Sequence, residues 1–166
     1  MISVGPRKFH VQGCRVWWVG GRSRNGMTHT ILYAEDDPND VALVQVAFQV
    51  RSDLDFHFVR DGLEALNYVF GRDKFTDRRI YPLPNLILLD LKMPRLSGFD
   101  VLAFLRQHSA FATIPVVVLS SSGLQSDIQK AKDLGAHDYR VKPADIDDMI
   151  TMVKDVALRW LGGSRP

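Results

Sequence analysis

The sequence predicts an α/β protein whose parallel sheet is covered by helices on both faces. Short apolar runs alternate five times with amphipathic stretches long enough to form helices, and this alternation is typical of parallel sheets. The central run, NLILLD at residues 85–90, places four large apolar residues between Pro84 and an acid. Such a run indicates a strand buried on both faces, and Pro94 prevents it from continuing beyond the next loop.

Composition places the chain among ordinary globular proteins. Its 166 residues favour one domain with a sizeable core, and 46% are hydrophobic while 24% are charged. No apolar run approaches the ~18 residues that span a bilayer. The single cysteine, Cys14, excludes an intramolecular disulfide and a multi-thiol metal site. The five histidines lack paired ligand spacing, so we expect no zinc site.

The basic character of the chain resides in its first segment. Residues 1–26 carry five basic residues and no acid, so the net charge of +2 falls to −3 when they are left out. Nucleic-acid binding by the remainder therefore has little support. The segment shows no clean periodicity, and three interpretations stay open: a poorly ordered tail, a partner-binding arm using Trp17 and Trp18, or an upstream extension of a domain that starts naturally at Met27. We favour the extension, and expect residues 1–27 to be poorly ordered and residues 162–166 to form a short tail.

The first half of the domain predicts two strand–helix units and a long connection. Residues 30–34 form an apolar strand that ends in acids, and a helix from Pro38 to about Arg51 follows, with Asp37 as a plausible N-cap. Residues 55–59 alternate like a strand at the sheet edge, and Asp61-Gly62 leads into the second helix. Residues 71–84 are rich in charge and are expected to form a surface loop.

The second half predicts three more units. Ser97-Gly98 opens a helix, and the apolar strand at residues 115–119 is followed by Ser120. The next helix has a thin apolar stripe and ends at Gly135. Residues 137–141 alternate and read as the opposite edge strand, with charges that discourage edge-to-edge pairing. The last helix begins near Asp145.

Chemically distinctive side chains follow the predicted strands. Glu35-Asp36 follow the first strand, Asp90 the third, Ser120 the fourth and Lys142 the fifth. Parallel strands bring these ends to one side of the sheet. Converging carboxylates form a hard oxygen site suited to Mg²⁺, and their crowding should raise at least one pKa. Asp90 alone could be an ordinary loop aspartate, but in this setting it is a candidate nucleophile toward phosphorus, with Lys142 as a point charge for an anion.

From about Thr28 to Leu161 the chain resembles the receiver domains of two-component response regulators. The resemblance rests on the acid pair 35–36, the run LLDLKMPRLSG at residues 88–98, Ser120, Tyr139 and Lys142-Pro143. The long charged connection and the Trp-Leu ending at residues 160–161 are similar to the single-domain regulators that partner bacterial phytochrome-type histidine kinases.

The resemblance implies a fold and a metal site. It implies a flavodoxin-like, doubly wound five-stranded sheet in the order 2-1-3-4-5, with Asp90 as phosphoacceptor. Mg²⁺ would be held by the side chains of Asp36 and Asp90 and by the backbone carbonyl of Lys92, while Glu35 acts through water.

The resemblance also implies a switch and its partners. Lys142 would pair with the phosphoryl group, Ser120 would swing to bond it, and Tyr139 would change rotamer to fill the vacated space. The Lys142–Pro143 bond would be cis. The expected protein is a cytoplasmic phosphoacceptor switch and not a classical enzyme, with a histidine kinase and a downstream protein or phosphotransfer partner. A homodimer fits this pattern. Membrane association is not expected, because no apolar run is long enough to span a bilayer. Direct DNA binding is not expected either, because no helix-turn-helix pattern follows residue 161.

Two other functions fit the sequence less well. A metal-dependent phosphatase with an aspartyl-phosphate intermediate would have a second acid two residues after the nucleophile, where this chain has Lys92. A flavin carrier would need a Ser/Thr/Gly-rich phosphate loop after the first strand, where this chain has acids that would repel a flavin phosphate. Lys92 also places a cation beside the expected phosphorylation site, and its effect on the phosphoryl lifetime has no predicted sign.

Overall fold

A five-stranded parallel sheet forms the centre of the molecule. The computed structural model describes residues 7–11, 14–18, 28–48 and 53–161. The strand order is β4-β3-β5-β6-β7, which confirms the predicted 2-1-3-4-5 arrangement once the two strands that precede the domain are set aside. The strands are β3 (His29–Ala34), β4 (Leu54–Val59), β5 (Leu86–Leu89), β6 (Val116–Ser120) and β7 (Asp138–Val141).

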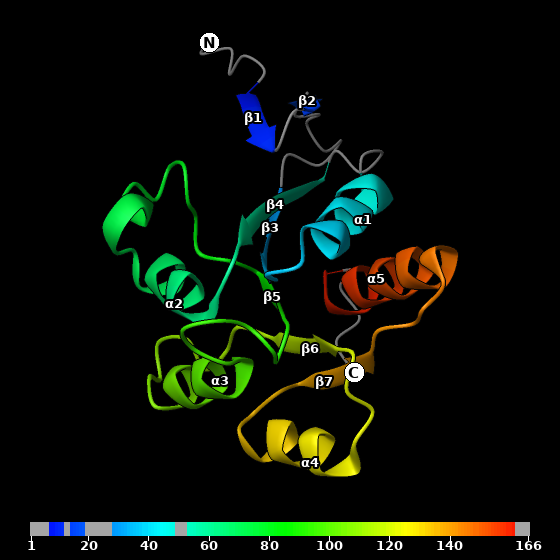
Figure 1. The fold of residues 1–166 in the computed structure, drawn as a ribbon. Coiled ribbons are helices and arrows are strands. Elements are labelled where there is room, and N and C mark those ends of the chain that lie inside the picture. The colour runs from blue at the N-terminus through cyan, green and yellow to red at the C-terminus, as the bar shows by residue number, and fades with distance from the viewer. Residues whose placement is uncertain (1–6, 12–13, 19–27, 49–52, 162–166) are drawn as a thin grey trace.

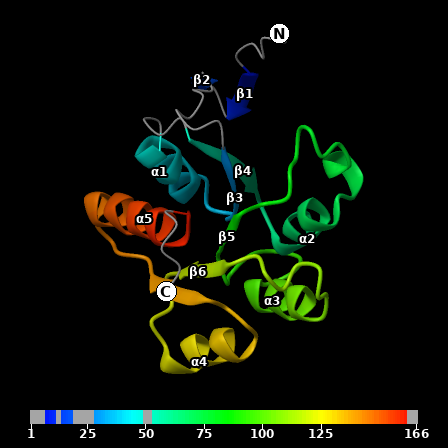
Figure 2. The ribbon, with the colours of Figure 1, turned by 180° about the vertical axis from the view of Figure 1, so that it is seen from behind.

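Helices cover both faces of this sheet (Figure 1). α1 (Pro38–Phe48) and α5 (Ile146–Leu161) lie side by side on one face. α2 (Gly62–Phe70), α3 (Gly98–Arg106) and α4 (Gln125–Asp133) cover the other, as the view from behind also shows (Figure 2). The sheet separates two apolar cores, one beneath each group of helices. This is the doubly wound architecture that the sequence predicts.

Burial along the strands follows their positions in the sheet. β5 and β6 are buried throughout, and β3 is buried after its first residue. β4 and β7 are only partly buried, which confirms that they form the two edges. Central strands of a parallel sheet lose both faces to helices, so their sequences read as continuous apolar runs.

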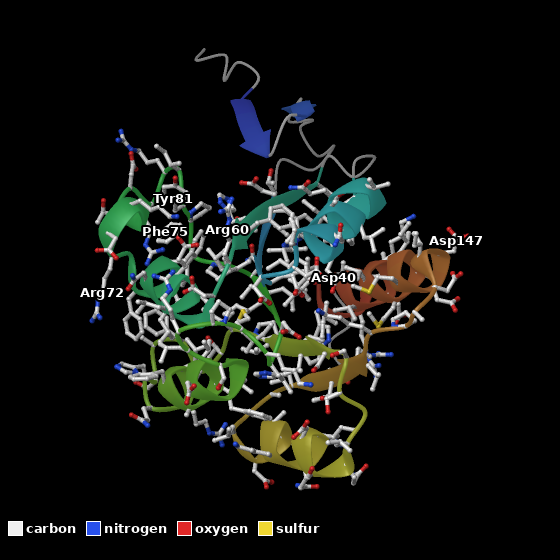
Figure 3. All side chains as sticks on the ribbon, in the orientation of Figure 1. Asp40, Arg60, Arg72, Phe75, Tyr81 and Asp147 are labelled. Carbon is white, nitrogen blue, oxygen red and sulfur yellow. The ribbon has the colours of Figure 1, made fainter. Side chains whose placement is uncertain are left out.

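The α2–β5 connection is a surface loop that is anchored to the domain by a few contacts. It contains the 3₁₀ turn η1 (Asp73–Phe75), and Phe75 is buried against Tyr68 and Tyr81. The Arg78 guanidinium donates hydrogen bonds to the carbonyl oxygens of Tyr68 and Val69 at the end of α2. The predicted surface loop is therefore confirmed, since most of residues 71–84 are exposed or half-buried, and aromatic residues spaced within this charged stretch anchor it to the domain. Figure 3 shows Phe75 and Tyr81 close together beside α2.

Two short strands are described ahead of the domain. β1 (Arg7–Val11) pairs antiparallel with β2 (Cys14–Trp18), a hairpin that the sequence pattern did not predict. The other expectations for residues 1–27, and those for residues 49–52 and 162–166, fall outside the described residues. Within the described part of the chain, α1 ends at Phe48. No described helix is both long and apolar enough to cross a membrane.

Candidate functional site

Three carboxylates meet at the carboxyl ends of the central strands. Ala34 of β3 pairs with Leu89 of β5, so Glu35 and Asp90 leave the sheet as neighbours. Each of these two side chains, together with Asp36, offers one oxygen, and the three oxygens lie within 4.8 Å of one another. Glu35 is 2% exposed and Asp90 is 5% exposed, whereas Asp36 is exposed. The predicted convergence of these three acids is confirmed.

This acid trio, Glu35, Asp36 and Asp90, fits a divalent cation. Carboxylate oxygens are hard ligands of the kind that Mg²⁺, Mn²⁺ and Ca²⁺ take in proteins. Two buried ligands fix the site, and the exposed third leaves one side open, as a cation that keeps several waters requires. The donor chemistry therefore supports a divalent-metal site at this end of the sheet.

Glu35 is the most heavily bonded member of the trio. Tyr33 donates its hydroxyl proton to Glu35 Oε2 at 2.8 Å, and Lys142 Nζ donates to the same oxygen at 2.5 Å. The backbone N–H of Asp37 donates to Oε1. Burial raises the pKa of Glu35, although the bonds from Lys142 and Tyr33 oppose this shift. A raised carboxylate pKa was expected from crowding, but burial is its main cause and the charge of Asp90 contributes less.

Lys142 reaches more acids than the sequence suggested. Its Nζ lies 2.5 Å from Glu35 Oε2, 2.8 Å from Asp40 Oδ2 and 3.5 Å from Asp90 Oδ1. Burial alone would lower the pKa of Lys142, but hydrogen bonds to Asp40 and Glu35 outweigh burial and raise it. Asp40 was not among the predicted site residues. Its only signal was a fourth acid in the EDDPND run, in the first turn of a predicted helix, where an acid is normally a solvated favourable end charge.

The loop after Asp90 is tightly held. The backbone N–H of Lys92 donates to Asp90 Oδ2 at 2.8 Å. A Cβ on Gly98 would lie 2.3 Å from the backbone oxygen of Asp90, so only glycine fits there. The guanidinium of Arg95, a residue with φ of +65°, pairs with the buried carboxylate of Asp61 at the start of α2. These contacts fix the carboxylate of Asp90 relative to its neighbours.

Ser120 and Tyr139 are linked through a residue that the sequence did not single out. Ser120 is fully buried, and its Oγ accepts a hydrogen bond from the N–H of Ser122. Tyr139 donates its hydroxyl proton to the carbonyl oxygen of Ser122 at 2.7 Å. Ser122 Oγ in turn donates to Asp127 on α4 at 2.5 Å. The β6–α4 loop therefore joins both predicted switch residues to α4.

The predicted cis peptide bond at Lys142–Pro143 is contradicted. The peptide bonds of the described residues are trans, and this one is among them. Trans is the intrinsically favoured form before proline, by about 0.5–1 kcal/mol. The backbone N–H of Lys142 donates to the carbonyl oxygen of Ser120. With the Lys142–Pro143 peptide bond trans, the Lys142 ammonium still contacts the carboxylate of Glu35.

Comparison with known proteins supports one family. The model of the response regulator receiver domain matches residues 31–154. Response regulator Rcp1 of Synechocystis is 34% identical over 132 residues, which cover 79% of this chain and 88% of Rcp1. The crystal structure of Rcp1 in its Mn²⁺-bound form aligns with a TM-score of 0.75 and 33% identity, over 82% of this chain and 96% of Rcp1.

Two further solved structures are similar to the chain. The phosphorylated cyanobacterial phytochrome response regulator RcpA aligns with a TM-score of 0.77 at 33% identity. RPA3017, a response regulator in red light signalling of R. palustris, aligns with a TM-score of 0.76 at 36% identity. Both alignments cover 82% of this chain and 96% of the other. The chain therefore belongs to the response regulator receiver family, the phosphoacceptor switches that histidine kinases control in two-component signalling.

Proposed function

We propose that Asp90 is the residue that accepts the phosphoryl group from a histidine kinase. The observation that carries the proposal is its position: Asp90 Oδ1 lies 3.5 Å from the Lys142 ammonium, and the Asp90 carboxylate belongs to the acid trio. An ionised carboxylate at such a point can attack phosphorus, while a nearby cation stabilises charge that develops on the phosphoryl oxygens.

Transfer of the phosphoryl group requires only the phosphorylated histidine of the kinase and the Asp90 carboxylate as reactants. A carboxylate oxygen of Asp90 forms a bond to phosphorus as the bond from phosphorus to the kinase histidine nitrogen breaks, and the imidazole keeps that electron pair. Lys142 pairs with a phosphoryl oxygen, and the Lys92 N–H keeps the Asp90 carboxylate oriented. Hydrolysis later returns Asp90 to its carboxylate and releases inorganic phosphate.

We propose Mg²⁺ as the metal. Asp36 and Asp90 would ligate it directly, together with the Lys92 carbonyl, and Glu35 would act through water. The bound ion would neutralise charge shared by the acids and the incoming phosphoryl group. An exposed Asp36 beside two buried acids suits a cation that retains several waters. The Mn²⁺ in the Rcp1 structure supports a divalent ion in the same family.

Ser120 and Tyr139 are the proposed switch. Ser120 carries a hydroxyl that can donate to a phosphoryl oxygen, and its oxygen accepts a 3.2 Å bond from Ser122 N–H. If Ser120 swings toward Asp90, the loop that also holds the Tyr139 hydroxyl changes with it. That movement would reach α4 through the Ser122–Asp127 bond.

The proposed kinase is of the bacterial phytochrome type. RcpA is described as a phytochrome response regulator, and RPA3017 as acting in red light signalling, and both cover most of this chain. We propose that the protein works in the cytoplasm, as a monomer or homodimer. Its output would be contact with a downstream protein or phosphotransfer onward, without direct DNA binding.

Labelling of an Asp90→Asn variant tests the acceptor. Parent and variant are incubated with a radiolabelled phosphorylated histidine kinase, with Mg²⁺ or with EDTA. The parent should gain hydroxylamine-sensitive label only with Mg²⁺, and Asp90→Asn should gain none, because an amide lacks the nucleophilic charge. Asp147→Asn, which changes an exposed acid in the first turn of α5, should label like the parent.

Two results would contradict the proposal. Retained label on a folded Asp90→Asn protein would place the acceptor elsewhere. Multiple turnovers of phosphate release with no accumulation of labelled protein would favour the phosphatase alternative.

A further inference from the structure

The Lys142 ammonium is held by a carboxylate outside the acid trio. Lys142 Nζ donates to Asp40 Oδ2 at 2.8 Å and to Glu35 Oε2 at 2.5 Å. The 3.5 Å from the same nitrogen to Asp90 Oδ1 exceeds the usual length of an N–H···O bond. The Lys142 side chain is 12% exposed and that of Asp40 25% exposed, so water screens this pair less than a surface ion pair.

The position of Asp40 is fixed by the packing of α1. Asp40 lies in the first turn of this helix, after Pro38. Val44 and Phe48 of the same helix are buried in the core that α1 shares with α5. Figure 3 shows Asp40 between α1 and α5, at the end of α1 near the site. An acid in a first helical turn is favourable without any partner, but a helix dipole does not explain a 2.8 Å bond to the ammonium of Lys142, a residue outside that helix.

We propose that Asp40 is a positioning residue that retains the Lys142 ammonium before phosphorylation and so slows phosphoryl transfer to Asp90. The inference rests on the proposed role of Asp90. When the phosphoryl group arrives, Lys142 must bond a phosphoryl oxygen, and Asp40 competes for the same ammonium.

The negative charge of Asp40 determines whether its removal speeds or slows phosphorylation. A carboxylate attracts an ammonium through a full opposite charge, whereas a neutral amide oxygen attracts it only through its dipole. Asp40→Asn keeps an oxygen acceptor of the same shape but removes the charge. The ammonium of Lys142 is then freer to turn toward Asp90. Phosphorylation should therefore be faster in the variant, and a phosphoryl mimic should bind more tightly.

The test compares matched variants of the full chain. Phosphorylation by phosphoramidate is followed at saturating Mg²⁺, and the affinity for beryllofluoride is measured by titration. Asp40→Asn should raise the rate constant and the beryllofluoride affinity by about three- to tenfold. Asp40→Glu keeps the charge and should stay within about twofold of the parent. Asp37→Asn removes an exposed acid that bonds Asn39 and not Lys142, and it should match the parent.

A double-mutant cycle separates positioning from a general charge effect. In a Lys142→Gln background, Asp40→Asn should no longer change either quantity, because the ammonium that it retains is absent. A rate increase that persists in this background overturns the inference. So does an Asp40→Asn protein, folded by circular dichroism, whose rate and affinity equal those of Asp37→Asn. If Asp40→Asn does not fold, Asp40→Ala is read by the same criteria, and failure of both variants to fold assigns Asp40 a structural role and overturns the inference. A parent that gains no label at all instead contradicts the proposed function.

Discussion

At the scale of single residues, the buried Glu35 links several groups of the site. Glu35 accepts hydrogen bonds from the Tyr33 hydroxyl, the Lys142 ammonium and the backbone N–H of Asp37. Its raised pKa means that the folded protein binds its proton more tightly than the unfolded chain does. Without metal, the contribution of Glu35 to stability is therefore complete below its ordinary pKa and declines as pH rises through the folded value.

Asp36 allows the metal to be tested with little disturbance of the fold. Because its side chain is exposed, Asp36→Asn should change the free energy of unfolding by no more than about 0.5 kcal/mol in EDTA. Mg²⁺ at 100 times its dissociation constant should stabilise the parent by about 2.7 kcal/mol, because it binds only the folded form. The variant, lacking one ligand, should gain less than about half of that.

Urea denaturation with and without Mg²⁺ provides the measurement. An Asp36→Asn protein that keeps the full Mg²⁺ response would exclude Asp36 from the metal site. A large loss of stability in EDTA would show that Asp36 has a structural role that its exposure does not suggest.

Individual residues were predictable where they end a strand. Glu35, Asp90, Ser120 and Lys142 follow apolar runs, and parallel pairing alone brings their backbones together. Asp40 was not predictable, because its partner lies 102 positions away and the contact depends on how α1 packs. Ser122 was missed for a similar reason, since its contacts depend on the path of the β6–α4 loop.

At the scale of elements, local rules explain how α3 begins next to the site. Ser97 caps the helix by accepting from Asp100 N–H, while the Asp100 carboxylate accepts from the Ser97 hydroxyl and N–H. These bonds, the hydroxyl first, hold the pKa of Asp100 below its usual range. A lowered pKa gives stability that is present above the ordinary aspartate value and is lost as pH falls through the folded value.

This capping box predicts a pH-dependent penalty for Asp100→Asn. At pH 7 the variant should lose about 0.5–1 kcal/mol, a modest amount because Asp100 is exposed. In acid, at a pH below the folded pKa, the parent aspartate is itself neutral and the difference should shrink toward zero. Urea denaturation at both pH values measures it, with the exposed Asp147→Asn as a control. A penalty of equal size in acid would show that shape, and not charge, accounts for the cap.

The helices and strands differ in how well they could be predicted from their sequences. Central strands read clearly, because burial on both faces leaves an uninterrupted apolar run. The α2–β5 connection was predicted as a surface loop, but its anchoring was not, since its aromatic residues contact α2 through tertiary packing that has no period. The β1–β2 hairpin was missed because its strands do not alternate cleanly.

At the scale of the whole molecule, the helices are buried to different extents, and α4 is the least buried of those beside the site. α1 and α5 share one core, and α2 and α3 contribute most of the helical residues of the other. Of α4 only Ala131 is buried, and β7 is half exposed. Segments with few buried contacts open most readily. We therefore expect α4 and Tyr139 to be the part of the described domain that changes conformation most readily when Asp90 is modified. The buried Ser120 lies between this part and the site.

The central claim is that Asp90 itself carries the phosphoryl group, and chemical mapping tests it most directly. The protein is phosphorylated with phosphoramidate and Mg²⁺, reduced with borohydride, digested and sequenced by mass spectrometry. Borohydride converts an aspartyl phosphate to homoserine, so homoserine should appear at position 90, and only in the sample that received the phosphoryl donor. Homoserine at another aspartate, or a stable phosphate on a serine or histidine with position 90 unchanged, would contradict the account.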